Sequence, residues 1–182
     1  MQIRLASTLQ KDSVVDGEGI RTVVWTQGCP HNCPGCHNPS THAFDEGFLV
    51  DIDEIKKELN ELEGQDGITL SGGDPLLQSK ASLEIAKHAK SIGLSVWCYT
   101  GYVFEDIINN PSQKALLDYV DVLVDGPFIL EKRSLNCTFR GSTNQRIIDV
   151  KKSLEKEQVV TIDIYDIKIN ETQLKKEEYI FI

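Results

Sequence analysis

Short apolar runs alternate with amphipathic segments through the middle of the chain. Continuous apolar and β-branched residues predict strands, whereas apolar residues that recur every three or four positions predict helices. On this basis we expect strands over 20–27, 67–75, 94–102 and 120–128. We expect helices over 51–64 and 79–93, and a helix over 105–120 that is broken around Pro111. Strands and helices therefore alternate along this part of the chain.

The helix over 51–64 carries its own start and stop signals. Asp51 and Glu54 have the spacing of a capping arrangement, and Gly64 is typical of a residue that follows the last turn. The helix over 79–93 similarly ends at Gly93. These signals predict where each helix begins and ends.

Alternation of apolar strands with helices is typical of a parallel sheet with helical crossovers, which are right-handed. Glycine-rich or polar sequences follow each strand: the cysteine-containing loop, SGGDP, TGY and DGPF. Since the carboxyl ends of parallel strands meet at one edge, we expect these four segments to converge on one site. The chain is too short for eight strand–helix pairs. We therefore predict an α/β fold of the partial, open parallel (β/α) barrel type.

A length of 182 residues fits a single domain over 1–182. Residues 159–169 alternate like a strand, and the alternation changes phase near Tyr165, which indicates a bulge or bend. We treat residues 151–182 as an extension to which the sequence assigns no role.

Charge and cysteine content narrow the function classes. The net charge is −9, and lysines alternate with glutamates, so we expect no binding of nucleic acid. No apolar run is long enough to span a membrane, and the first residues contain no apolar secretory segment. We therefore expect a cytoplasmic protein with no membrane partner. Five cysteines, an odd number, suggest a metal site rather than a disulfide framework.

Cys29, Cys33 and Cys36 have the spacing C-x3-C-x2-C in a short, proline-containing loop. A structural zinc ion needs four ligands, and a histidine within 31–42 would complete such a set. A [4Fe–4S] cluster normally takes four thiolates, so three would leave one iron with an open position for another ligand. The spacing favours the cluster and leaves zinc as the alternative.

The same spacing is the signature of the radical S-adenosylmethionine (SAM) enzymes, which the chain resembles. Five segments, GIRTVVWTQGCPHNCPGCHNPSTH, LSGGDP, WCYTGY, DVLVDGPF and FRGSTNQRIIDV, occur in the order typical of activating proteins of anaerobic (class III) ribonucleoside-triphosphate reductase. The resemblance covers residues 14–150. His37 takes the place of the aromatic residue usual after the last cysteine, and Asp74 stands where many radical SAM enzymes have glutamate.

The resemblance implies that Cys29, Cys33 and Cys36 hold three irons of a [4Fe–4S] cluster. The amino and carboxylate groups of SAM would bind the fourth iron. An electron from the reduced cluster would cleave SAM to methionine and a 5′-deoxyadenosyl radical. That radical would abstract hydrogen from a glycine of the partner, the glycyl-radical subunit of the reductase. Flavodoxin or ferredoxin is the electron donor usual in the family.

The resemblance also implies a set of SAM contacts. Gly35, Cys36 and His37 would lie along the adenine. The amino-acid end of SAM would meet the SGGDP segment, and Asp125 would accept hydrogen bonds from the ribose. The full predicted cofactor-binding set is Gly35, Cys36, His37, Gly72, Gly73, Asp74 and Asp125. From the residues alone, a tight turn at SGGDP and a turn-forming Asp-Gly at 125–126 remain alternatives.

Other residues and other functions stay open. Residues 99–101 are placed to line the same pocket. Arg140 would position SAM or the partner's peptide, or take a capping or surface role. Cys98 is expected in the core, and Cys137 has no ligand-like spacing. The alternative functions are an activase of another glycyl-radical enzyme, such as pyruvate formate-lyase, and a non-catalytic zinc-binding or iron–sulfur interaction module.

Overall fold

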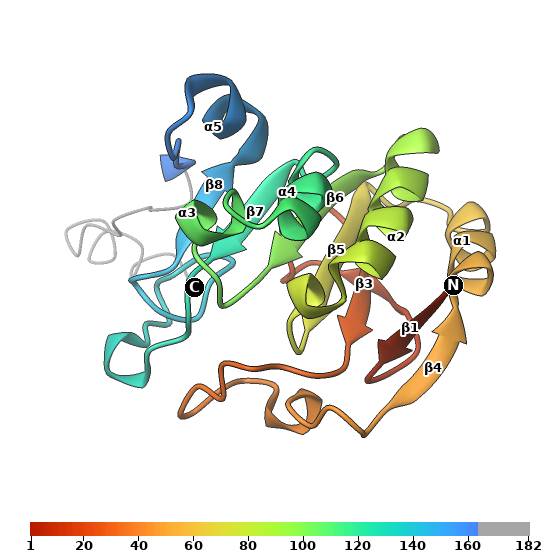
Figure 1. Ribbon diagram of the computed structural model, residues 1–182, viewed down its shortest axis with the longest axis horizontal. Helices are drawn as coiled ribbons and strands as arrows, with labels where there is room; N and C mark the ends of the chain where they lie inside the picture. The colour runs from red at the N-terminus through yellow and green to blue at the C-terminus, as the bar shows by residue number, and fades with distance from the viewer. Residues whose placement is uncertain (164–182) are drawn as a thin grey trace, which may run out of the picture.

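Within residues 1–163, which the computed structural model describes, eight strands form one mixed sheet (Figure 1). Its strand order is β4-β1-β3-β5-β6-β7-β8, and β2 pairs with β3. The strands are β1 (Gln2–Leu5), β2 (Gln10–Ser13), β3 (Arg21–Thr26), β4 (Phe48–Asp51), β5 (Gly67–Gly72), β6 (Ser95–Tyr99), β7 (Val122–Asp125) and β8 (Arg146–Asp149). The four strands expected in the middle of the chain are therefore present, as β3, β5, β6 and β7.

The predicted parallel arrangement holds for the centre of the sheet and is wrong for its margins. The four central strands pair in parallel, in the order β3-β5-β6-β7. The outer pairs β1–β3, β1–β4, β2–β3 and β7–β8 are antiparallel. The four outer strands are only four residues long, and β2 has the sequence QKDS. Such strands carry too little apolar pattern to be recognised, because pairing with a neighbour determines their conformation.

The helices follow the predicted order. They are α1 (Ile52–Asn60), α2 (Ser79–Ser91), α3 (Phe104–Ile107), α4 (Pro111–Leu117) and α5 (Val150–Lys156), with short 3-10 turns η1 (Pro39–Thr41), η2 (Pro75–Gln78) and η3 (Leu130–Lys132). The side chain of Asp51 caps α1 by accepting from Asp53 N at 3.0 Å. The last residue of α1 is Asn60, so the helix ends before the predicted stop at Gly64. The expected break at Pro111 separates α3 from α4.

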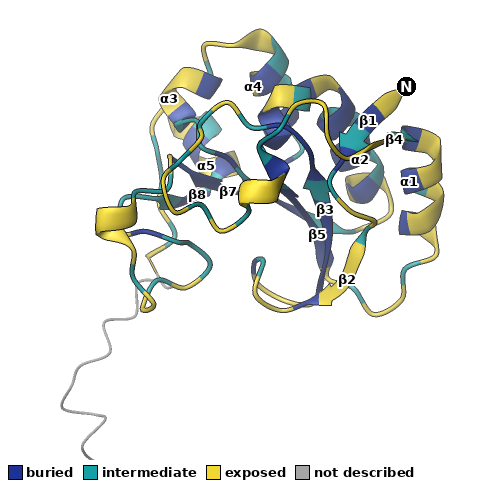
Figure 2. Cartoon of the chain, turned by 90° about the horizontal axis from the view of Figure 1, so that it is seen from below, coloured by how far each residue is buried: buried dark blue, intermediate teal, exposed yellow. Residues whose placement is uncertain are grey.

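The main core lies between the helices and one face of the sheet (Figure 2). Alternate residues of the central strands point into it, and all are buried: Val24, Ile68, Leu70, Val96, Cys98 and Leu123. Cys98 is 0% exposed, so its predicted place in the core is confirmed. Sequential parallel strands joined by right-handed crossovers carry their helices on the same face, which leaves the other face free of them.

The opposite face of the sheet is more polar and holds a smaller apolar cluster of Trp97, Val124 and Ile147. Arg21 is buried there and donates hydrogen bonds to Thr69 and Ser95, which ties β3, β5 and β6 together. This face and the carboxyl ends of the strands frame the site described below.

The predicted strand over 159–169 is only partly within the described residues. Thr161 forms an isolated antiparallel bridge with Ile148, and Ile162 N donates to Ile147 O at 2.8 Å. The expected bend near Tyr165 lies outside the described residues. Across residues 1–163, every helix is too short or too polar to traverse a lipid bilayer.

Candidate functional site

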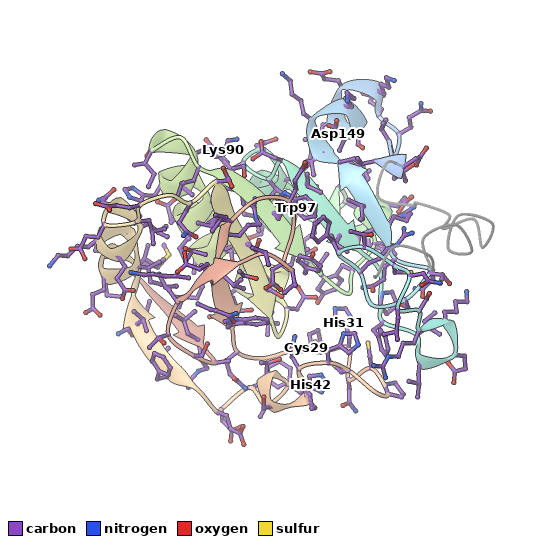
Figure 3. The ribbon with its side chains drawn as sticks, turned by 180° about the vertical axis from the view of Figure 1, so that it is seen from behind. Cys29, His31, His42, Lys90, Trp97 and Asp149 are labelled. Atoms are coloured by element: carbon purple, nitrogen blue, oxygen red, sulfur yellow. The ribbon has the colours of Figure 1, made fainter. Side chains whose placement is uncertain are left out.

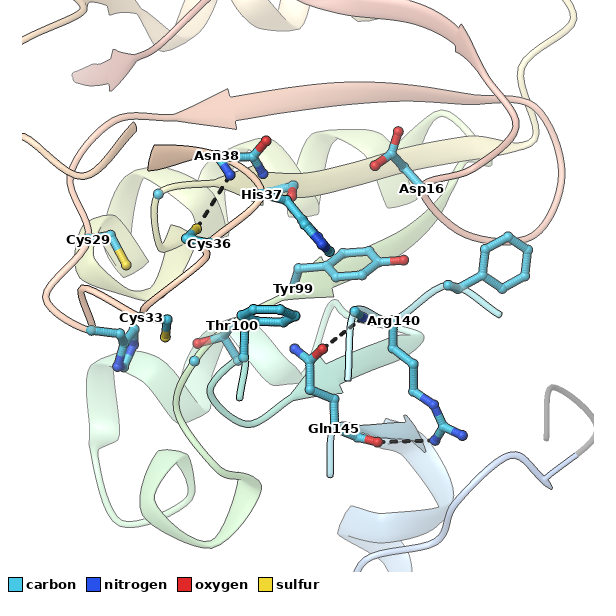
Figure 4. A pocket seen from close by; sticks show the side chains of 18 of the residues that line it. Asp16, Cys29, Cys33, Cys36, His37, Asn38, Tyr99, Thr100, Arg140 and Gln145 are labelled. Atoms are coloured by element: carbon cyan, nitrogen blue, oxygen red, sulfur yellow. Dashed lines mark hydrogen bonds between the residues drawn. The ribbon is translucent and has the colours of Figure 1, made fainter. Parts of the chain in front are cut away.

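A cavity of about 580 Å³ opens at the carboxyl ends of the central strands (Figure 4). Each of the four predicted segments contributes to its wall: Cys29, Cys33, Cys36 and His37 after β3, Gly72 and Gly73 at the end of β5, Thr100 and Gly101 after β6, and Gly126 and Phe128 after β7. The predicted convergence of these segments is confirmed. The volume lies in the range typical of small-molecule sites.

The three cysteines of the C-x3-C-x2-C loop are half-buried and lie in the cavity wall (Figure 4). Figure 3 shows where Cys29, His31 and His42 lie in the fold. Burial raises the pKa of Cys29 and of Cys33, and the negative charge of Asp74 raises both further. Both groups are therefore neutral thiols at neutral pH in the metal-free protein. A metal or cluster that binds them as thiolates must displace their protons.

The ends of the cysteine loop are tied together by the backbone. Gly28 N donates to Thr41 O at 2.8 Å, and Cys29 N donates to His42 O at 3.1 Å. Near the tip, Asn38 N donates to the Cys36 sulfur at 3.4 Å. Gly28 has a φ of +96°, in the region that favours glycine. The loop thus leaves β3 and returns to its starting point, with its thiols toward the cavity.

Gly72 and Gly73 line the cavity and also allow close contact with the cysteine loop. A Cβ on Gly72 would lie 2.5 Å from Thr26 O, and one on Gly73 would lie 2.2 Å from Gly28 O. The sequence suggested that these glycines make room for a ligand. The structure adds that they make room for the backbone of β3 and of the residue before Cys29.

Asp74 lies behind the cavity wall. Its side chain is 0% exposed and accepts hydrogen bonds from four donors: the His31 ring at 2.7 Å, the Thr100 hydroxyl at 2.9 Å, Gly101 N at 3.0 Å and Leu76 N at 2.9 Å. Its carboxylate is therefore bound on both oxygens by the protein. Its predicted contact with SAM remains a prediction.

Asp125 and Gly35 also lie outside the cavity lining. The Asp125 carboxylate is 1% exposed, binds the Arg146 guanidinium, with Nε–Oδ1 at 2.9 Å, and accepts from Phe104 N at 2.8 Å. Hydrogen bonds to Asp125 and then to Glu105 raise the pKa of Arg146. The neighbour of Asp125, Gly126, lines the cavity in its place.

Several lining residues were not predicted. Val14, Val15 and Asp16 come from the segment between β2 and β3, and Cys137 and Phe139 come from the segment between β7 and β8. The apolar pair VV inside the polar stretch KDSVVDGEG was only a weak signal, since single exposed apolar residues are common on ordinary protein surfaces. Nothing in the spacing of Cys137 indicated its position.

Tyr99 lines the cavity, as expected for residues 99–101, and Arg140, whose role the sequence left open, lines it too (Figure 4). The Tyr99 hydroxyl is buried and has no hydrogen-bond partner within residues 1–163. Burial raises its pKa, so the phenol is neutral and able to donate. Arg140 Nη1 donates to Gln145 O at 3.0 Å. A buried hydroxyl without a partner is a natural donor to a bound ligand.

The donor set of the cavity wall consists of three thiols. A structural zinc ion takes four ligands, whereas a [4Fe–4S] cluster takes one thiolate on each iron. Thiolates around a cubane cluster each bind a different iron and therefore lie further apart. Three thiols in the wall of a cavity with room for a further ligand fit a cluster with one iron left open.

Comparisons with known proteins agree with this chemistry. The family described as "4Fe-4S single cluster domain" matches residues 15–148. The anaerobic ribonucleoside-triphosphate reductase-activating protein of Haemophilus influenzae is 37% identical over 142 residues, which cover 74% of this chain and 90% of that protein. The protein of that name from Escherichia coli K12 is 36% identical and covers 72% and 90%, and that of Enterobacteria phage T4 is 37% identical and covers 73% and 86%.

Among solved structures, QueE from Escherichia coli covers 56% of this chain and 53% of its own length. The TM-score is 0.45 and the sequence identity is 15%. Likeness at this level is too limited to bear on the fold or the function.

Proposed function

The chain belongs to the family of anaerobic ribonucleoside-triphosphate reductase-activating proteins, and we propose that it is a radical SAM activase that generates a glycyl radical on such a reductase. The observation that carries this proposal is the placement of Cys29, Cys33 and Cys36 in one cavity wall at the strand ends. The three thiols of this loop and the match to the 4Fe-4S family together supply a cluster site, which SAM cleavage requires.

In this proposal Cys29, Cys33 and Cys36 would hold a [4Fe–4S] cluster through three irons and leave the fourth for SAM. The bound, reduced cluster would supply the single electron for cleavage of SAM to methionine and a 5′-deoxyadenosyl radical. A hydrogen atom from a glycine Cα of the reductase would then give 5′-deoxyadenosine and the glycyl radical. Each step is homolytic, so no side chain has to act as a general base.

The residues around the thiols orient SAM and exclude water. We assign the adenine end to the segment Gly35, Cys36 and His37, of which Cys36 and His37 line the cavity, and the amino-acid end to the half-buried Gly72 and Gly73. His37 packs against the Phe128 ring at a centroid distance of 5.0 Å, which supports an aromatic wall beside the nucleoside. Tyr99 supplies a buried donor without a partner among the described residues.

We assign Asp74 and Asp125 a positioning role, which differs from the SAM contact that the sequence resemblance implied. Their carboxylates are already bound by protein donors, which supports a role in positioning the strand ends over direct contact with SAM.

We further propose that the sheet is a partial, open (β/α) barrel within one domain over 1–182. The sequential order β3-β5-β6-β7, the helices on one face and the cavity at the carboxyl ends support this. An incomplete barrel leaves its cavity open at the side, where a loop of another protein can enter.

The rim of the cavity supports a protein substrate. Val14 and Val15 line it and are 65% and 71% exposed. Exposed apolar side chains around a site are typical of a protein-binding surface. The cluster also requires a one-electron donor, for which we propose a flavodoxin or ferredoxin, in a cytoplasm that keeps the thiols reduced.

Anaerobic reconstitution tests the proposal. About four irons and four sulfides per chain are expected for this cluster type, and dithionite with SAM should release 5′-deoxyadenosine. With the reductase present, electron paramagnetic resonance should show a glycyl doublet. One zinc per chain with no SAM cleavage would overturn the proposal, and cleavage without a doublet would redirect it to another glycyl-radical enzyme.

Single substitutions test the ligand assignment. Cys29→Ala, Cys33→Ala and Cys36→Ala should each abolish SAM cleavage. Cys98→Ala is the matched control, because Cys98 lies in the core away from the cavity and should leave cleavage intact. Cleavage retained in any of the first three variants would contradict the assignment.

A further inference from the structure

We propose that Asp74 and His31 form a clamp that fixes the cysteine loop, residues 28–37, in the geometry that the cluster needs. This inference rests on the proposed function for the identity of the cluster. It makes Asp74 a positioning residue that acts through His31, and it gives His31 a role that the sequence did not assign.

The clamp joins three strand ends. His31 lies between two of the proposed ligands, Cys29 and Cys33, and donates from Nε2 to Asp74 at 2.7 Å. Asp74 follows β5, and the same carboxylate accepts from Thr100 and Gly101, which follow β6. The carboxylate thereby connects the cysteine loop to two strands of the rigid sheet.

The imidazole occupies a niche that its neighbours shape. A Cβ on Gly101 would lie 2.4 Å from the His31 ring, so only glycine at this position admits the ring. The Tyr102 ring meets it edge to face, with centroids 4.6 Å apart. The Asp74 side chain at the base of the niche is 0% exposed, and that of His31 is 18% exposed. A buried ionic hydrogen bond of this kind is strong and directional.

The negative charge of Asp74 by itself would disfavour a cluster bound by thiolates, so its hydrogen bonds must account for a carboxylate at this position. A carboxylate beside three thiolates repels them. Removal of its charge should therefore favour a cluster held by three thiolates, whereas removal of its hydrogen bonds should release the loop. The two effects have opposite signs, so a substitution that keeps the shape of Asp74 separates them.

The first test measures release of the cluster to an iron chelator, without SAM and without reductase. In Asp74→Asn an NH2 group replaces one oxygen and faces N–H donors, and in His31→Leu the ring donor is lost. Both variants should lose the cluster about tenfold faster than the unmodified protein, as is typical when an outer-shell contact is removed. His31→Gln keeps an N–H donor and should rescue most of the lifetime.

A matched control accounts for general destabilisation. Asp121 also accepts a backbone hydrogen bond at a strand end, from Val96 N at 2.7 Å, but lies at the amino ends of β6 and β7. Asp121→Asn should leave cluster release within about twofold of the unmodified protein, since it touches no part of the loop.

The second test uses the cluster-free protein, so it stands even where no cluster assembles. Hydrogen exchange should quicken about tenfold at the amides of Gly28 and Cys29, in Asp74→Asn and His31→Leu but not in Asp121→Asn. If the unmodified protein assembled no cluster, that result would count against the proposed function. The hydrogen-exchange measurement would still decide whether the clamp holds the loop.

Three outcomes would overturn the clamp. Slower cluster release in Asp74→Asn would show that its charge dominates. Unchanged release with weaker SAM binding, confined to Asp74→Asn, would make Asp74 a SAM ligand. Unchanged loop exchange in both clamp variants would show that other contacts hold the loop.

Discussion

Substitution of Gly73 by alanine tests how the cysteine loop is located. Gly73 does not have a positive φ, so its backbone conformation is open to any residue. The added Cβ would nevertheless lie 2.2 Å from Gly28 O, 2.7 Å from Gly28 C and 2.8 Å from Thr41 O. All three are backbone atoms, which cannot rotate away as a flexible side chain would.

The size of the perturbation follows from these distances. Real Cβ contacts essentially never fall below 3.0 Å, so the oxygen of Gly28 must move from 2.2 Å to that limit, a shift of about 0.8 Å. Functional sites tolerate displacements of about 0.5 Å. Overpacking of this kind costs about 1–3 kcal/mol. Strain on the 2.9 Å hydrogen bond from Asp74 N to Gly28 O adds up to about 1 kcal/mol.

Two measurements on Gly73→Ala check the prediction. Urea unfolding of the cluster-free protein should show a loss of about 1–4 kcal/mol, and anaerobic reconstitution should give clearly less iron per chain. Gly93→Ala is the control, because Gly93 has a φ of +86° and an added Cβ there would meet no atom within 4 Å. It should lose about 1–2 kcal/mol through backbone strain alone and bind iron fully. Normal stability and full iron content in Gly73→Ala would refute the reasoning.

Three further predictions concern the rim, the phenol and an ion pair. Val14→Asp with Val15→Asp should lower glycyl-radical formation on the reductase while SAM cleavage with dithionite is unchanged; equal loss of both would place these residues in SAM binding. Tyr99→Phe should weaken SAM binding in a titration without lowering the unfolding temperature, since its hydroxyl has no partner among the described residues to lose. The hydrogen bond from Arg146 lowers the pKa of Glu105 below its usual value, so this contact stabilises the fold above that usual value and less as pH falls through the lowered pKa. The stability difference between Glu105→Gln and the unmodified protein should therefore shrink in acid, and a constant difference would contradict this.

Local pattern was enough to predict the central architecture. The strands β3, β5, β6 and β7 are rich in apolar and β-branched residues because most residues on both of their faces are buried, and the helices between them have their own caps and breaks. Parallel pairing then forces the carboxyl ends of the strands to one edge. Convergence of the cysteine loop with SGGDP, TGY and DGPF followed from that rule alone.

The outer strands were decided by tertiary pairing. Strand β4 pairs with β1 over four residues, and β8 pairs with β7 over four. Segments this short gain their conformation from hydrogen bonds to a neighbour that is distant in the sequence. The predicted all-parallel sheet failed at its margins for this reason.

The sequence by itself determined which chemistry the chain carries: three thiols at C-x3-C-x2-C spacing, delivered to the edge of a parallel sheet. Only the tertiary structure decided which polar groups face the cavity and which lie behind it. Asp74 and Asp125 stand next to the lining glycines in the chain, yet their carboxylates are turned into the protein by His31 and Arg146. The physical reason is that a buried carboxylate must find donors, and those donors come from segments that only folding brings together.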